Sequence, residues 1–181
     1  MGMKIEIIKV GKLECNCYLL DLGGKILIID PGDEGDKIIK AIGNKCVVGI
    51  IITHYHFDHI GALDEIVNKY GVNVYDKTNM NEGNNRIDNF IFDVVYTPGH
   101  KEDLITIYFK EDKVMFCGDF IFRNNIGRCD LPGGNIKDMI NSIDKIKKYD
   151  RDIIIYPGHG DRTSIGYEMD NNMYFLDINI I

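Results

Sequence analysis

Histidine and aspartate gather in one short segment of this chain. The run His54-Tyr55-His56-Phe57-Asp58-His59 places three imidazoles and a carboxylate within six residues. In an extended loop, residues two apart project to the same side, so His54 and His56 can grip one ion while Asp58 and His59 face a neighbouring point. Imidazole and carboxylate at this density suit zinc, iron or manganese. Taken alone, the segment could instead be a loop of surface histidines in which Asp58 caps a helix.

Three further residues of the same chemistry lie far along the chain. His100 and His159 each follow a Pro-Gly pair, and Asp119 follows Gly118. Each of them by itself could be an ordinary turn residue. The chain has only five histidines, however, and all five lie in loops of the kind that follow an apolar run. Because scattered surface histidines would not segregate in this way, the joint pattern predicts a metal site.

The number of candidate ligands predicts two ions. Five imidazoles and two carboxylates are too many for one tetrahedral zinc. The expected first set is His54, His56 and His100, the expected second set is Asp58, His59 and His159, and Asp119 bridges the two. Paired ions of this kind lie about 3.5–4 Å apart and hold a water between them.

Two more residues are candidates for orienting the ligands. A metal-bound imidazole usually donates its other N–H to a carboxylate or carbonyl, which fixes its tautomer. Asp30 and Thr53 each directly follow one of the apolar runs, and we consider them candidates for this role. For Asp30, a turn residue before Pro31 is the alternative interpretation.

Short apolar runs precede the polar loops and are expected to position them. Each is rich in Ile and Val, which is typical of buried strands, and is followed by Gly, Pro or polar residues that turn the chain. The loops that follow five such strands are expected to lie together at a common edge of the sheets. The runs are 26–29, 47–52, 91–96, 114–117 and 153–156.

Helical periodicity appears between these runs. Apolar residues recur at helical spacing over 60–70, ending at Gly71, and over 136–146, where Asn135 is a plausible N-cap. A shorter helix is expected near 34–42, and alternation predicts half-buried strands over 4–10 and 104–109. The runs near 91–96, 104–109 and 113–117 are joined too closely for a crossover helix, so we expect them to be antiparallel. The pattern predicts mixed sheets with helices outside them.

Bulk composition limits the possible classes of function. A length of 181 residues fits a single domain spanning 1–181. The net charge of −7, with no basic stripe, argues against a nucleic-acid partner. No signal peptide or membrane span is evident, and the five scattered cysteines suit unpaired thiols in a reducing, cytoplasmic compartment. A metal role for Cys15 and Cys17 is possible, but burial in an apolar run is the simpler interpretation.

The ordered motifs resemble the metallo-β-lactamase superfamily. The resemblance is carried by Thr53–His59, Gly99-His100, Gly118-Asp119 and Gly158-His159-Gly160, and it extends from Asn16 to about Asn172. The stretches 126–134 and 165–168 are similar to the short glyoxalase II-like (hydroxyacylglutathione hydrolase-like) subgroup. The resemblance implies an α+β, αββα sandwich of two mixed β-sheets flanked by helices. It places the same seven ligands on two divalent transition-metal ions, with zinc expected and iron or manganese as alternatives.

The resemblance also implies an activity. A hydroxide held between the ions and oriented by Asp58 or Asp119 would attack the carbonyl of an acyl thioester. Arg128 is a candidate for binding a substrate carboxylate, with a structural ion pair as its alternative, and Arg123 and Tyr167 are weaker candidates. Classical glyoxalase II carries a further C-terminal helical part that helps to bind glutathione, and we expect no such glutathione-binding domain here.

Two other functions remain open from the sequence. Persulfide dioxygenases share much of this motif set but use one iron, at positions matching His54, His100 and Asp119. A non-catalytic metal-binding module on the same fold is the second alternative. Metal analysis and oxygen uptake would separate the first from a hydrolase, and absence of any hydrolysis by fully metallated protein would support the second.

Overall fold

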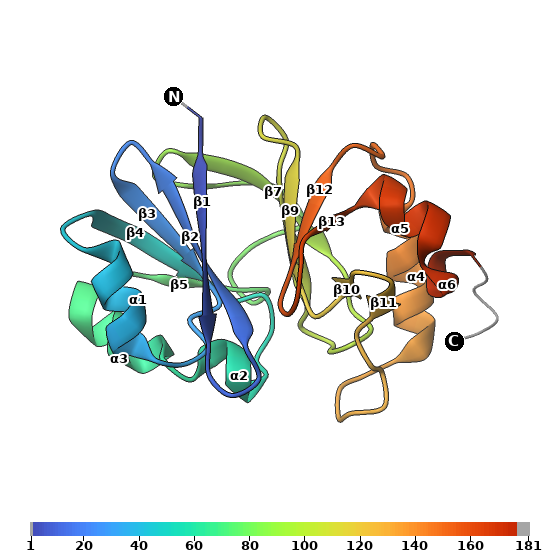
Figure 1. Ribbon diagram of the computed structural model, residues 1–181, viewed down its shortest axis with the longest axis horizontal. Coiled ribbons are helices and arrows are strands. Elements are labelled where there is room, and N and C mark those ends of the chain that lie inside the picture. Colours follow the sequence, from blue (N-terminus) through green and yellow to red (C-terminus); the bar gives the residue numbers. More distant parts are fainter. Residues whose placement is uncertain (1, 177–181) are drawn as a thin grey trace.

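The computed structural model describes residues 2–176, in which two β-sheets face each other between two layers of helices (Figure 1). The first sheet has the strand order β1-β2-β3-β4-β5 and the second has the order β13-β12-β9-β8-β7-β6, with β10 and β11 as a separate hairpin. The sequence-based prediction of an αββα sandwich is confirmed. The strands are β1 (Lys4–Val10), β2 (Cys15–Leu22), β3 (Lys25–Ile29), β4 (Cys46–Ile51), β5 (Val74–Tyr75), β6 (Gly83–Ile87), β7 (Phe90–Tyr96), β8 (Ile105–Phe109), β9 (Val114–Gly118), β10 (Ile121–Phe122), β11 (Asn125–Ile126), β12 (Ile154–Pro157) and β13 (Thr163–Ser164).

Helices cover the outer face of each sheet (Figure 1). Helices α1 and α3 lie against the first sheet, and α4, α5 and α6 lie against the second, while α2 is a single turn in the loop after β4. No helix within residues 2–176 is long and apolar enough to cross a membrane. The helices are α1 (Gly35–Ile42), α2 (Phe57–Ile60), α3 (Leu63–Tyr70), α4 (Ile136–Ile146), α5 (Ile165–Asn171) and α6 (Met173–Leu176).

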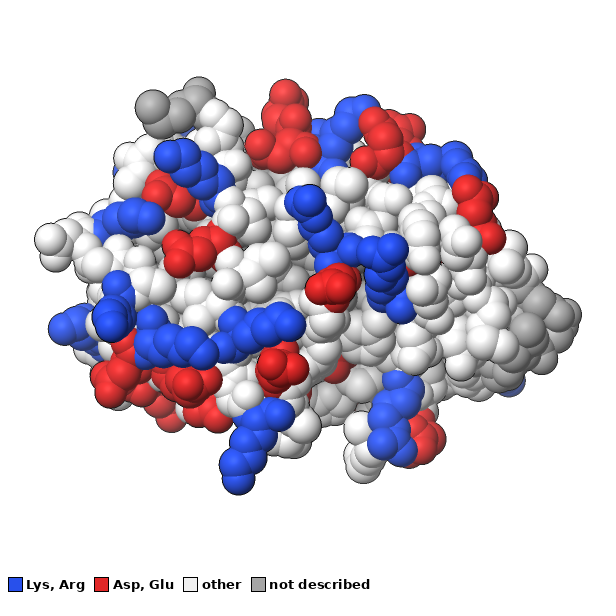
Figure 2. All heavy atoms as spheres, viewed as in Figure 1, with Lys and Arg blue, Asp and Glu red and all other residues white. Residues whose placement is uncertain are grey.

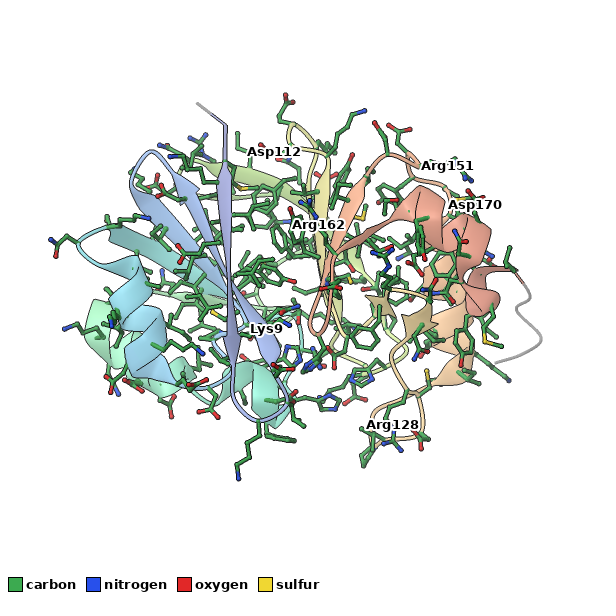
Figure 3. All side chains as sticks on the ribbon, viewed as in Figure 1. Lys9, Asp112, Arg128, Arg151, Arg162 and Asp170 are labelled. Carbon is green, nitrogen blue, oxygen red and sulfur yellow. The ribbon has the colours of Figure 1, made fainter. Side chains whose placement is uncertain are left out.

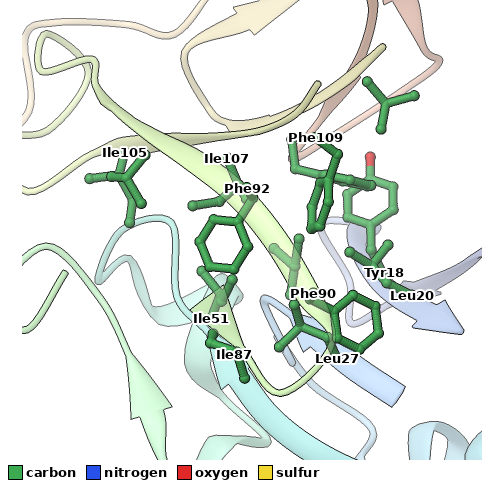
Figure 4. Packing of buried hydrophobic residues seen from close by; sticks show 14 of the residues in the cluster. Tyr18, Leu20, Leu27, Ile51, Ile87, Phe90, Phe92, Ile105, Ile107 and Phe109 are labelled. Carbon is green, nitrogen blue, oxygen red and sulfur yellow. The ribbon is translucent and has the colours of Figure 1, made fainter. Parts of the chain in front are cut away.

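The layered arrangement explains why the central strands are apolar on both sides. In β3, Leu27 and Ile29 face the space between the sheets, whereas Ile26 and Ile28 face the helices. A strand buried on both faces loses the polar alternation of a surface strand. The core between the sheets is packed with large side chains from both of them (Figure 4), including Tyr18, Leu20, Ile51, Phe90, Phe92, Ile105, Ile107 and Phe109.

Strand directions bring the loops to one rim. Strands β3 and β4 are parallel, and so are β9 and β12. Strand β7 pairs antiparallel with β8, and β8 pairs antiparallel with β9, as expected from their short connections. Strands β7, β9 and β12 therefore run in the same direction, and their carboxyl ends lie at one edge of the second sheet. The common rim predicted from the sequence is thus built from two sheets, with two of the five loops coming from the first.

The predicted helix over 60–70 is divided in the structure. Helix α2 ends at Ile60 and α3 begins at Leu63, because the backbone N–H of Ala62 donates to the carbonyl of Pro31. A Cβ atom at Gly61 would lie 2.3 Å from the carbonyl oxygen of Gly32, so only glycine permits this close approach. The other predicted helix ends hold: Gly71 follows α3 in the left-handed conformation, and Asn135 caps α4 through its side chain.

Candidate metal centre

All seven candidate ligands converge at the shared rim of the two sheets. Each comes from the carboxyl end of a strand, where the buried strand fixes the position of the loop that follows. His54 and His56 follow β4, Asp58 and His59 lie in α2, His100 follows β7, Asp119 follows β9, and His159 follows β12.

Three imidazoles form the first cluster. The distance between His54 Nε2 and His56 Nδ1 is 3.1 Å, and that between His56 Nδ1 and His100 Nε2 is 2.9 Å. The three nitrogens all lie within 4.8 Å of one another. This spacing allows all three nitrogens to contact a single ion placed among them.

The second cluster contains two imidazoles and a carboxylate, with Asp119 between the two sets. His159 Nε2 lies 3.1 Å from Asp58 Oδ2, and His59 Nε2 lies 3.2 Å from Asp119 Oδ1. Asp119 Oδ2 is 3.6 Å from Nε2 of His159 and 3.6 Å from Nε2 of His100, which belongs to the first cluster. The carboxylate of Asp119 thus faces both clusters.

Hydrogen bonds at the far side of the rings favour one tautomer. In three of the histidines, Nδ1 lies within 3 Å of an oxygen that can only accept a hydrogen bond. Nδ1 therefore carries the hydrogen, and the lone pair of Nε2 points into the cluster. The pairs are His59 with Asp30 Oδ2 (2.9 Å), His100 with the carbonyl of Arg128 (2.7 Å) and His159 with the carbonyl of Leu13 (2.9 Å).

Asp30 and Thr53 form a buried network beneath the ligands. The backbone N–H and the hydroxyl of Thr53 both donate to the Asp30 carboxylate, at 2.8 and 2.6 Å. Because its hydrogen is used in this way, the Thr53 hydroxyl oxygen is left to accept from His54 Nδ1, which is 3.1 Å away. Asp30 lies in irregular chain directly after β3, at a positive φ of 50°.

Two buried polar atoms in the cluster make no hydrogen bond. Nε2 of His59 and Oδ1 of Asp119 have no hydrogen-bond partner within the described part of the chain, although both are inaccessible to solvent. An unpaired buried polar atom costs about 1–3 kcal/mol, and such atoms are uncommon in native proteins. A lone pair on nitrogen and one on oxygen, both directed inward, fit a bound divalent cation. The donor set therefore fits two transition-metal ions.

Electrostatics keep His54 and Asp119 in the form that binds metal, whereas at His59 and His159 the neighbouring carboxylates outweigh burial and raise the pKa, so these imidazoles would release a proton when an ion binds. Burial and the neighbouring histidines hold the pKa of His54 well below its usual value, so its imidazole is neutral. Burial by itself would raise the pKa of Asp119, but the electrostatic interactions with His59, His159 and His100 lower it on balance. Neutral imidazole and ionised carboxylate are the ligating states.

One glycine makes the close packing of the cluster possible. A Cβ atom at Gly158 would lie 2.1 Å from Asp119 Oδ1 and 2.7 Å from His59 Cε1. Both distances are far below van der Waals contact. The glycine before His159, seen in the sequence only as a turn signal, is therefore required by the space that Asp119 occupies.

A cavity of about 670 Å³ opens onto the clusters. Its floor includes His56, Asp58, His100, Asp119 and His159. Its walls include side chains that the sequence did not single out, because an apolar or basic residue in a loop carries no distinctive spacing. These are Leu13, Phe57, Leu131, Pro132 and Lys101, and they stand beside Arg128, which was a candidate from the sequence.

Of the three residues predicted to bind substrate, only Arg128 lies at the metal cavity. Arg128 lines the cavity, but its exposed guanidinium forms two hydrogen bonds of 2.6 Å to Asp130, which matches the structural alternative. Tyr167 lies on α5 and lines a separate pocket with Arg123, so the structure brings neither of them to this cavity.

The cysteines make no disulfide within residues 2–176. Cys15 and Cys17 are both buried, as the simpler interpretation held. Cys15 Sγ lies 3.6 Å from His59 Nδ1, the nitrogen that is hydrogen-bonded to Asp30. Burial raises the pKa of Cys15 to about 11, so this thiol stays protonated.

Comparison with known proteins gives a consistent result. The model of the family described as the metallo-beta-lactamase superfamily matches residues 10–76 and 85–159. A probable metallo-hydrolase, YqgX of Bacillus subtilis, is 32% identical, with 95% of this chain and 97% of that protein covered. The hydroxyacylglutathione hydrolase GloC of Haemophilus influenzae is also 32% identical, with 95% and 98% covered.

Solved structures share the same architecture. A B3 metallo-beta-lactamase, BLEG-1, superposes with a TM-score of 0.92 at 30% identity, covering 96% of this chain and all of that one. TTHA1623 in a di-iron-bound form gives a TM-score of 0.86 at 28% identity, covering 93% and 99%.

Proposed function

Since this chain belongs to the metallo-β-lactamase superfamily, we propose that it is a binuclear metal-dependent hydrolase whose substrates are acyl thioesters. Membership of the family supports a metal-dependent hydrolase acting on a small molecule. The number and identity of the ions, the roles of the seven ligands and the thioester as substrate class are our proposal. A relative named as a hydroxyacylglutathione hydrolase, similar over nearly its whole length, supports the thioester.

The observation that carries the proposal is the second cluster. A single ion would need only the three imidazoles of the first cluster and one carboxylate. The chain instead brings Asp58, His59 and His159 to the other side of Asp119, at distances of 3.1–3.8 Å between nitrogen and oxygen atoms. In addition, His59 Nε2 and Asp119 Oδ1 lack hydrogen bonds despite their burial. A second cation explains both the convergence and the unpaired atoms.

The chemistry follows from the cavity and the carboxylates. Bound divalent ions would supply a water of lowered pKa and positive charge beside the reacting carbonyl. Asp58 and Asp119 line the cavity floor, where their carboxylate oxygens can accept hydrogen bonds from an attacking water and orient it. Leu13, Phe57 and Leu131 form an apolar wall suited to the acyl group. Lys101 lines the same cavity, and its ammonium is paired with Asp103 at 3.2 Å.

Elemental analysis paired with thiol release from a panel of acyl thioesters tests the proposal. We expect about two transition-metal ions per chain, zinc being the expected metal, and metal-dependent thiol release. His56→Ala should lose both metal and turnover, and a variant that keeps full activity would refute the first-site assignment. One iron per chain, together with oxygen uptake in the presence of a persulfide, would refute the proposed hydrolase activity and indicate a dioxygenase. Full metal loading without hydrolysis of thioesters, lactones or phosphodiesters would indicate a non-catalytic module.

The proposal also places the protein in the cytoplasm, without nucleic acid or membrane as a partner. The free cysteines suit a reducing compartment. The net charge of −7 is unfavourable for binding a polyanion such as nucleic acid.

A further inference from the structure

A second cavity of about 670 Å³ lies beside the candidate metal centre. It is bounded by the exposed strand β1 on one side and by β12 and the loop after it on the other, and we call it the basic groove. The residues that line it are Ile5, Ile7, Lys9, Asn16, Arg123, Tyr156, Gly160, Asp161 and Arg162.

Three cations border the basic groove without an ion-pair partner. Lys9, Arg123 and Arg162 are exposed, and in the described portion of the chain none of their side chains forms an ion pair or donates a hydrogen bond. Many other cations of the protein are paired, for example Arg151 with Asp170 at 2.6 Å. Figure 2 shows basic side chains over the middle of the face where Figure 3 labels Lys9 and Arg162. On a protein with a net charge of −7, these three cations outnumber the one carboxylate of the lining, that of Asp161.

Two uncharged polar groups of the basic groove also lack partners. The side chain of Asn16 is 1% exposed, and its amide nitrogen donates to the carbonyls of Pro157 and Gly160. Those two bonds fix the amide orientation and leave Oδ1 as a buried acceptor without a hydrogen bond. Tyr156 lines the same cavity, and its hydroxyl makes no hydrogen bond to any residue from 2 to 176.

Arginine chemistry defines what the basic groove can hold. The guanidinium of Arg123 lies over the ring of Tyr167, with its carbon 4.7 Å from the ring centre, which holds it by a cation–π contact. Its N–H edge, like that of Arg162, remains available for two parallel hydrogen bonds to the oxygens of a phosphate or carboxylate. Ile5 and Ile7 provide an apolar strip beside the charges.

We propose that the basic groove binds a small molecule that carries phosphate or carboxylate groups, with Arg123 and Arg162 as its principal anchors and Lys9 as an additional charge. The hydroxyl of Tyr156 completes the polar lining. This site is separate from the metal cavity, since no residue lines both.

The two cavities are nevertheless close together, because neighbouring residues of the same segments line them. His159 lines the metal cavity, whereas Gly160, Asp161 and Arg162 line the basic groove. Leu13 lines the metal cavity, and Asn16, just beyond it in the chain, lines the basic groove. The anionic group can therefore belong either to the thiol portion of the substrate, an origin that rests on the proposed function, or to a separate effector.

Binding is tested on zinc-loaded, ¹⁵N-labelled protein with adenosine 3′,5′-bisphosphate as the probe. We expect shifts of the side-chain signals of Asn16, Arg123 and Arg162. Calorimetry at fixed ionic strength should show affinity falling about 10- to 100-fold in Arg162→Ala, because a hydrogen bond to a charged group is lost. Arg162→Lys should lose less, and Arg86→Ala, on β6, should bind as the wild type does. Absence of these shifts, or equal affinity in Arg162→Ala and Arg86→Ala, would overturn the proposal.

Kinetics separate the two origins of the anion. If the group belongs to the substrate, Arg162→Ala raises KM for an acyl-coenzyme A but not for an acyl-N-acetylcysteamine, and the bisphosphate competes with the first substrate. If it belongs to an effector, the bisphosphate changes turnover of both thioesters equally. The binding experiment needs no turnover, so failure of the thioesterase proposal and failure of the basic groove are distinguished.

Discussion

Asp30→Asn should weaken metal binding although Asp30 itself is not a predicted ligand. The carboxylate is 2% exposed and accepts three hydrogen bonds, from the Thr53 backbone, the Thr53 hydroxyl and His59 Nδ1. Asparagine retains one accepting oxygen and replaces the other with an NH₂ group, which only donates. With the amide oxygen facing the Thr53 backbone N–H, the NH₂ group faces both the Thr53 hydroxyl and His59 Nδ1.

The hydroxyl can rotate, but the imidazole can relieve the donor–donor conflict only by moving its hydrogen to Nε2. That hydrogen would then point at Asp119 Oδ1, 3.2 Å away, and block the lone pair that we assign to the second ion. Loss of a partner that orients a metal-bound histidine typically costs 10- to 100-fold in affinity or activity, and we expect about that loss at the second site.

The assay is zinc affinity by competition with a chelator of known strength, together with thiol release. The matched control is Asp36→Asn, an exposed acid in α1, which should behave as the wild type does. The first ion should be retained more tightly than the second in Asp30→Asn, because Thr53 still supports His54. If Asp30→Asn holds both ions with wild-type affinity and turns over normally, the role assigned to the His59 tautomer is wrong.

Three further results are expected. Gly158→Ala should lower activity about 100-fold. The added Cβ atom would lie 2.1 Å from Asp119 Oδ1, so the carboxylate would have to move by more than about 1 Å. Measurement of metal content and kcat tests this expectation. Removal of both metal ions should lower Tm by about 10–20 °C, because each of the two sites saturated at 100 times its Kd contributes about 2.7 kcal/mol and 1 kcal/mol shifts Tm by about 2–4 °C at this size. An unchanged melting curve in chelator would contradict this expectation. Burial and, to a lesser extent, the charge of Asp130 raise the pKa of the Cys129 thiol to about 11. Alkylation of Cys129 should therefore accelerate about tenfold per pH unit between about pH 8 and 10, and it should be faster in Asp130→Asn. A rate that levels off near pH 8 would refute the shift.

The convergence of the ligands could be predicted because their signal is local. A histidine that follows a buried strand and a Pro-Gly turn can be recognised in the sequence, and its recurrence at His100 and His159 predicts a shared site. The strand cores and α4 were predictable for the same reason, since burial on both faces or at helical spacing leaves a clear apolar pattern.

Features that depend on backbone contacts were not predictable. The break at Gly61 arises from the carbonyl of Gly32, and the acceptors for His100 and His159 are main-chain carbonyls, which any residue type supplies. Tyr167 follows His159 closely in sequence, yet α5 carries it to the other side of β13. Strand β2 was not predicted although Gly23-Gly24 follows it, because Asn16 and Asp21 interrupt its apolar pattern.

The most direct measurement is the anomalous scattering of zinc-loaded crystals, recorded above and below the zinc absorption edge. Our account predicts two peaks about 3.5–4 Å apart, one among His54, His56 and His100, the other among Asp58, His59 and His159, with Asp119 between them. A single peak at full zinc occupancy, or peaks away from these seven side chains, would contradict it.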